Sequence, residues 1–179
     1  MQLRHVFQST PSPAGAIQYG NNPEAGHYAG AGDARIYYEL YGQGEPLVVL
    51  HGGNLGSTYE MAGFIDKLSP SYQVIAVSTR GHGRSEIGAA PFTLEQRAND
   101  ALAVINAVTQ DSVIVLGFSD GAYSGYKLAS LYPERVKKLI AIGAGEMKPG
   151  PGTFNLTSKA VFALDEPYWQ QQLQLMPEP

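Results

Sequence analysis

The chain has 179 residues, carries a formal net charge of −4 and contains no cysteine. This length fits one domain with a sizeable core, and the mild acidity gives no electrostatic reason to expect nucleic acid or an anionic membrane surface as a partner. The lack of cysteine in the sequence excludes a disulfide framework, a thiolate zinc site and a cysteine nucleophile.

No apolar run in the sequence reaches the length of a transmembrane helix, and the first residues lack the apolar stretch of a signal peptide. We therefore expect a cytoplasmic protein, or an exported one whose signal peptide was removed before this numbering begins. The four histidines are scattered without metal-binding spacing, and the glycine-rich loops lack the phosphate-binding pattern. The sequence thus predicts no metal and no cofactor.

The first third of the chain reads as an irregular arm followed by short strands. Residues 1–26 contain two clusters of turn-forming residues, at 10–15 and 20–23, which predict an extended arm, partly disordered. Residues 35–41 predict a strand, and a turn separates it from the apolar run 47–50. That run predicts a buried central strand.

The middle of the chain alternates helical and extended patterns. Ser57 is the expected cap of a helix that runs to about Leu68, and residues 72–77 predict the next strand. A glycine-rich loop follows at 78–85. Thr93 and Gln96 form a capping-box pattern, after which apolar residues recur on one helical face to about residue 108.

Residues 113–122 contain the pattern that is most informative about the fold and the active site. Four apolar residues, three of them β-branched, predict a buried strand, and Gly-Phe-Ser-Asp-Gly follows at 117–121. A helical pattern begins directly afterwards and stops near Tyr132. A strand, a tight turn and a helix in this order are typical of a nucleophile elbow with Ser119 at its tip. The alternative is a plain turn between a strand and a helix.

The last part of the chain adds one more strand, after which the alternation of strands and helices ends. Residues 136–142 predict another buried strand, which we expect to end at 143–146. Residues 148–152 predict a linker, and 153–175 a helical segment. Alternation of strands and helices predicts an α/β fold with a mostly parallel sheet, helices on both faces and an antiparallel edge formed by the first strands.

Four separated motifs together resemble the α/β-hydrolase fold family. Residues 51–53 (His-Gly-Gly) resemble its oxyanion loop, 80–85 its R-G-x-G-x-S loop, 117–121 its elbow, and 133–136 the entry to its sixth strand. The resemblance runs from about residue 27 to residue 146. It implies a sheet with one antiparallel strand and a variable lid inserted after the sixth strand.

The resemblance also predicts how the chain divides. We expect an N-terminal arm at 1–26, a hydrolase core with strands one to six at 27–146, and the start of a lid at 147–179. The last two strands of the family and most of its lid are missing from this sequence, so we expect a C-terminally truncated member. The exposed edge of strand 136–142 would then favour self-association into a homo-oligomer.

The resemblance assigns chemistry to three residues. Ser119 is the candidate nucleophile, and the backbone N–H groups of Gly53 and Asp120 are the candidate oxyanion-hole donors. Family members with aspartate at the nucleophile position include haloalkane dehalogenases and epoxide hydrolases, so a serine favours acyl transfer to water. The elbow is similar to that of valacyclovirase-type small-ester hydrolases. Asp120 could therefore attract an ammonium group of the substrate, or simply favour the helix N-terminus.

The family triad continues with an acid and then a histidine, but no histidine follows His82 in this sequence. Glu146 is a candidate acid, with a plain role at the lid base as the alternative. His51 and His82 resemble histidines that hold loops in this family. Without a positioned base, a serine is a poor nucleophile at neutral pH.

These observations predict an impaired serine hydrolase that attacks a small ester-like substrate through Ser119. The alternative is a non-catalytic remnant of the family that binds a small molecule or a protein partner. We expect no nucleic acid and no membrane as partners.

Overall fold

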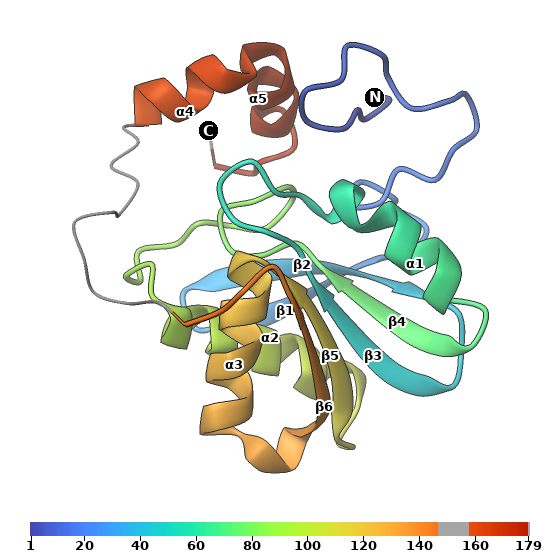
Figure 1. Ribbon diagram of the computed structural model, residues 1–179, viewed down its shortest axis with the longest axis vertical. Coiled ribbons are helices and arrows are strands. Elements are labelled where there is room, and N and C mark those ends of the chain that lie inside the picture. The colour runs from blue at the N-terminus through green and yellow to red at the C-terminus, as the bar shows by residue number, and fades with distance from the viewer. Residues whose placement is uncertain (147–157, 179) are drawn as a thin grey trace.

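The computed structural model describes residues 1–146 and 158–178, and its centre is a six-stranded sheet in the order β1-β2-β4-β3-β5-β6 (Figure 1). Strand β2 pairs antiparallel with both neighbours, whereas β4, β3, β5 and β6 pair in parallel. The expected mostly parallel sheet with an antiparallel edge is confirmed. The strands are β1 (Gly26–Ala31), β2 (Ala34–Tyr41), β3 (Glu45–Leu50), β4 (Tyr72–Val77), β5 (Val113–Phe118) and β6 (Val136–Ile142).

Helices cover both faces of the sheet, as the alternation of elements predicts. The apolar core on one face includes residues of α2 and α3, and the core on the other face includes residues of η1 and α1. The helices are η1 (Thr58–Met61), α1 (Ala62–Leu68), α2 (Leu94–Val108), α3 (Asp120–Leu131), η2 (Pro133–Arg135), α4 (Ser158–Leu164) and α5 (Glu166–Leu173).

The strand register brings two loops together at one edge of the sheet. Strands β3 and β5 are parallel neighbours, and Leu50 at the end of β3 pairs with Gly117 near the end of β5. The loop that begins at His51 and the turn at Ser119 therefore leave the sheet side by side. Ligand sites of open α/β sheets lie at such carboxyl ends.

Of two helix starts with a predicted cap, the one at Thr93 is capped by its side chain and the one at Ser57 is not. Thr93 Oγ1 accepts a hydrogen bond of 3.0 Å from Gln96 N, as the capping-box pattern predicts. Ser57 makes no side-chain cap, and the segment after it is first the 3₁₀ helix η1 and only then α1. The predicted linker at 148–152 and the first part of the predicted helical segment, 153–157, lie outside the described residues.

Strand β6 corrects the expectation of a buried strand. It lies at the end of the sheet, and its residues are intermediate or exposed, with Ile140 45% exposed. The apolar composition of the segment alone cannot distinguish a central strand from an edge strand. The exposed edge itself agrees with the sequence argument for a sheet that ends at the sixth strand.

The N-terminal arm contains no helix and no strand before Gly26, as expected, but it is packed against the rest of the chain. Leu3 and Tyr19 are buried in the core that also contains η1 and α1. The buried Glu39 carboxylate of β2 accepts a hydrogen bond of 2.7 Å from the backbone N–H of Gly20 in the arm. Figure 1 shows the arm beside α5, although the two segments lie at opposite ends of the sequence.

Candidate active site

Ser119 occupies a strained turn between β5 and α3. Its φ of 50° and ψ of −114° lie outside the usual regions for a residue with a side chain. The glycines on either side allow a close strand–helix approach, since a Cβ on Gly117 would lie 2.4 Å from the Gly121 carbonyl oxygen. Ser119 N donates to the Ile142 carbonyl oxygen at 2.8 Å, which fastens the turn to the end of β6. Strain of this kind is often found at functional sites.

A cavity of about 570 Å³ opens at this turn, and the structure brings the three expected residues together in its wall. Ser119, Gly53 and Asp120 all line it. Among the described residues, the backbone N–H groups of Gly53 and Asp120 donate to no protein acceptor. The cavity is completed by Asn54, Phe92, Thr93, Leu94, Arg97 and Tyr123.

The Asp120 carboxylate forms an ion pair with Arg97 of α2. The Arg97 guanidinium in turn lies over the Phe92 ring, 5.6 Å from its centroid. The carboxylate therefore already has a cationic partner within the chain. This ion pair argues against a role for Asp120 in binding an ammonium group of the substrate, because the carboxylate is already neutralised by Arg97.

His51 is buried and both of its ring nitrogens have partners. Nδ1 lies 2.6 Å from the Gly52 carbonyl oxygen, and Nε2 accepts from Thr79 N at 3.0 Å. Burial, with His82 and Arg97 as further causes, lowers the pKa of His51 to about 3. A neutral imidazole with these partners holds the 51–54 loop against the loop after β4.

His82 also serves the loops. Its Nδ1 lies 3.1 Å from the Arg80 carbonyl oxygen, and its ring packs edge-on against His51 with 5.1 Å between centroids. Burial lowers the pKa of His82. All four histidines are among the described residues, and none of them lines the cavity or hydrogen-bonds to Ser119.

Glu146 lies four residues beyond Ile142, the last residue of β6, so it does not itself end the strand as the sequence suggested. It is exposed and is not among the residues that line the cavity. The neighbouring Gly145 N donates to Tyr123 Oη at 3.4 Å. The segment after β6 therefore passes close to the cavity wall, although the Glu146 side chain does not contribute to it.

Arg80, from the Arg-Gly-His-Gly-Arg-Ser loop, is a structural residue. Its guanidinium is 1% exposed and pairs with both carboxylate oxygens of Asp100 at 2.8 Å, and with Asp33 at 2.8 Å. These contacts tie the loop after β4 to α2 and to the turn between β1 and β2. The same loop contains Thr79, whose backbone N–H donates to His51, so these contacts also fix the position of His51 beside the site.

Sequence reasoning did not assign the other six residues of the cavity wall to the site, and three of them, Phe92, Arg97 and Tyr123, have large side chains. Arg97 lies one turn inside a helix that the capping box predicted correctly. Its partner Asp120 is 23 residues away on another helix, and no local pattern predicts that pairing. Phe92 lies next to the Thr93 cap, and the capping-box pattern indicates only where the helix begins.

Comparison with known proteins agrees with this geometry. The family model of the alpha/beta hydrolase fold matches residues 45–176. That match covers most of the chain and includes the loop at 51–53, the elbow and α5. The chain therefore belongs to the α/β-hydrolase fold family.

Individual relatives are similar over part of their length. RutD of Azorhizobium caulinodans, a candidate carbamate hydrolase, is 34% identical over 119 residues, which are 64% of this chain and 43% of that protein. 3-Oxoadipate enol-lactonase 2 of Acinetobacter baylyi is 30% identical over 115 residues, 62% of this chain and 42% of that protein. The structure of the epoxide hydrolase CorEH superposes with a TM-score of 0.62 and 32% identity, covering 70% of this chain and 47% of that one.

The chain thus spans less than half the length of the curated relatives it matches. Across residues 1–146 and 158–178, no helix is long and apolar enough to cross a membrane. In the same residues, no group of three histidine, aspartate or glutamate side chains is arranged to hold a metal ion.

Proposed function

We propose that the chain is the core of a serine hydrolase that cleaves a small ester-like acyl substrate through Ser119. The observation that carries this proposal is that Ser119, Gly53 and Asp120 line one cavity, and that the backbone N–H groups of Gly53 and Asp120 donate to no protein acceptor among the described residues. A nucleophile and two converging donors are the minimum that acyl transfer requires.

In the proposed reaction, Ser119 Oγ attacks the carbonyl carbon and its proton passes to a base. The carbonyl π electrons move to the oxygen, and the N–H groups of Gly53 and Asp120 donate to the resulting oxyanion. Asp120 begins α3, so the partial positive charge of the helix N-terminus adds to this stabilisation. Collapse expels the leaving alkoxide and leaves an acyl group on Ser119, which water then removes.

The chemistry of the nucleophile favours this class within the family. The sequence has serine at the position where the resemblance places aspartate in epoxide hydrolases. The names of the relatives point the same way, because a carbamate and an enol-lactone both contain an acyl carbonyl group. We therefore propose an acyl substrate rather than an epoxide, despite the similarity to CorEH.

The proposal needs a general base that the described residues do not supply, since no histidine lines the cavity. We propose that the base comes from outside them and that Glu146 is the candidate acid. Any activity of the chain as it stands is then slow. The lack of a histidine in the cavity also supports the second candidate function, a non-catalytic protein that binds a small molecule there.

Hydrolysis of short p-nitrophenyl esters separates the two functions. We expect slow release of p-nitrophenol by the chain and its loss in Ser119→Ala. The matched control is Ser130→Ala, at an exposed position near the end of α3. Equal release by all three proteins would show that the turnover does not depend on Ser119. Binding of the ester without turnover would favour the non-catalytic function.

A further inference from the structure

Helix α5 contacts the loop that carries one of the proposed oxyanion donors. The Tyr168 side chain is fully buried, and its Oη donates to the Leu55 carbonyl oxygen at 2.8 Å. Leu55 lies two residues after Gly53. This hydrogen bond joins residues 113 positions apart, so the segment after β6 reaches back to the loop after β3.

The loop at 53–56 is a tight turn with little freedom. Gly56 N donates to the Gly53 carbonyl oxygen at 2.9 Å, and Asn54 has a φ of +50°. A Cβ on Gly56 would lie 1.9 Å from the Gly52 carbonyl oxygen, so the turn folds directly onto the start of the loop. A non-glycine residue at positive φ persists where its surroundings enforce that conformation, and Tyr168 contacts this turn at its third residue.

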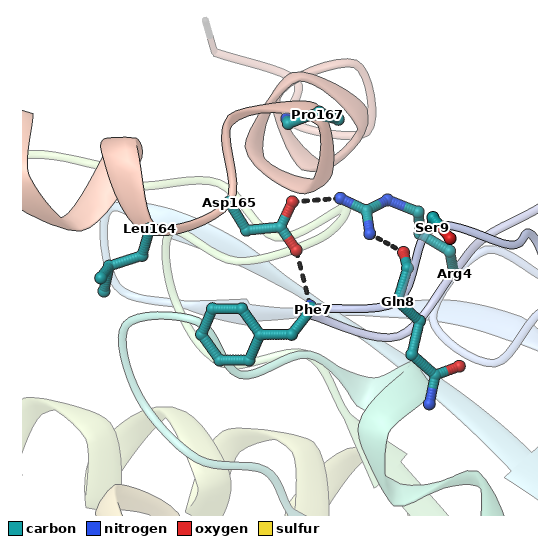
Figure 2. Close-up of a pocket in the computed structure, with 7 residues that line it drawn as sticks. All are labelled: Arg4, Phe7, Gln8, Ser9, Leu164, Asp165 and Pro167. Atoms are coloured by element: carbon teal, nitrogen blue, oxygen red, sulfur yellow. Dashed lines mark hydrogen bonds and ion pairs between the residues drawn. The ribbon is translucent and has the colours of Figure 1, made fainter.

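The N-terminal end of α5, which carries Tyr168 in its first turn, is held by the N-terminal arm. Asp165 caps α5 by accepting a hydrogen bond from Tyr168 N at 3.2 Å. Figure 2 shows the same carboxylate between the Arg4 guanidinium, with which it forms an ion pair, and Phe7 N, which donates to it at 2.6 Å. These contacts border a cavity of about 420 Å³ between the arm and the helices. They fix the position from which Tyr168 extends to the loop.

We propose that Tyr168 is a positioning residue for the oxyanion hole. Its hydroxyl group holds the 53–56 turn in the conformation that directs the Gly53 N–H into the cavity, and Asp165 holds α5 so that the hydroxyl reaches Leu55. Tyr168 does not line the cavity, so it acts through the loop and not on the substrate. This proposal rests on the proposed function, because it takes Gly53 as an oxyanion donor.

Tyr168→Phe tests the proposal, since it removes the hydroxyl group and keeps the buried ring. We expect the rate of adduct formation between Ser119 and a fluorophosphonate probe to fall about tenfold, less than the 10²–10³-fold loss typical when a donor is deleted outright. With an ester substrate, kcat is expected to fall while KM changes little. Asp165→Asn is expected to have a smaller effect in the same direction.

The matched control is Tyr132→Phe, which removes a hydroxyl that donates to Asn99 Oδ1 at 2.7 Å at the far end of α3. We expect no change in the adduct rate for this variant. The second readout is hydrogen exchange of the Gly56 amide, which closes the turn. Its exchange is expected to be faster in Tyr168→Phe and unchanged in Tyr132→Phe.

The two readouts separate failure of this proposal from failure of the proposed function. If the unmodified chain forms no adduct, the proposed hydrolase function is wrong. Faster exchange of the Gly56 amide in Tyr168→Phe would then still support the proposal that the Tyr168 hydroxyl stabilises the 53–56 turn. If the unmodified chain reacts and Tyr168→Phe reacts equally fast, the positioning role is overturned. Slower reaction with unchanged Gly56 exchange would also overturn it, because the effect would not pass through the turn.

Discussion

The side chain of Asp120 occupies the space that a side chain on Gly53 would need. A Cβ on Gly53 would lie 3.0 Å from Asp120 Cβ and 3.1 Å from its Cγ. A glycine at 53 allows the backbone to approach a substrate closely. The structure adds another reason, because the two residues that carry the proposed donors pack against each other. The arrangement of one donor therefore depends on the other.

Gly53→Ala is expected to disturb both donors without unfolding the chain. The added methyl group must displace the Asp120 side chain, whose carboxylate forms an ion pair with Arg97. We expect the fluorophosphonate adduct rate to fall at least tenfold, with the circular dichroism spectrum unchanged. Gly30→Ala in β1 is the control, because nothing lies within 4 Å of the added Cβ. An unchanged rate in Gly53→Ala would contradict the assignment of this contact to the oxyanion hole.

Much of the fold follows from local patterns, because the elements that build it are local. The apolar run 113–116 and the glycines on either side of Ser119 predict a strand and a sharp turn without knowledge of the rest of the chain. The Thr93 cap was predictable for the same reason. The family resemblance then placed Gly53 and Ser119 at one site, and the register of β3 with β5 provides the physical reason.

Features that depend on distant partners could not be predicted. The Arg97–Asp120 ion pair joins two helices, and the Tyr168–Leu55 hydrogen bond joins residues 113 positions apart. The burial of strand β6 was predicted wrongly because apolar composition does not reveal how far other elements cover the side chains of a strand, although its exposed edge was expected from the family resemblance. The packing of the N-terminal arm was missed because its turn-forming residues resemble those of a solvated segment.

Loss of the buried Arg80–Asp100 pair is expected to destabilise the fold strongly. Both side chains are almost fully buried, so Asp100→Asn leaves a buried guanidinium with less compensating charge. We expect a loss of about 3 kcal/mol in the free energy of unfolding, measured by urea denaturation. Glu95→Gln, in the exposed pair with Lys127, is the control and is expected to cost less than about 1 kcal/mol. A similar small cost for both variants would contradict the structural role given to Arg80.

The buried histidine His51 is expected to make stability depend on pH. Its pKa is about 3 in the folded chain and about 6.5 when unfolded, so the unfolded state binds an additional proton between these values. Stability that is present above pH 6.5 is therefore lost as the pH falls toward 3, by about 1.4 kcal/mol per pH unit. Urea denaturation at pH 7 and pH 5 measures this, and His51→Gln is expected to show a weaker dependence. A His51 ring signal that titrates near pH 6.5 in NMR spectra would contradict it.

The exposed edge of β6 is expected to promote self-association. Its outward-facing Ile140 is 45% exposed, and the strand has a neighbour on one side only in the described sheet. Open apolar edges of this kind pair with strands of other chains. Light scattering should show a mass that rises with protein concentration, and Ile140→Lys should lower it. A monomer at every concentration tested would exclude this interface.

The most direct measurement is fluorophosphonate labelling read by intact mass, on the unmodified chain and on Ser119→Ala. The proposed function predicts one adduct on the unmodified chain, formed slowly, and none on Ser119→Ala. That result would mean that a base reaches Ser119 despite the lack of a histidine in the cavity wall. No adduct on folded, unmodified chain, or an adduct that persists in Ser119→Ala, would contradict the role of Ser119 as the nucleophile of this chain.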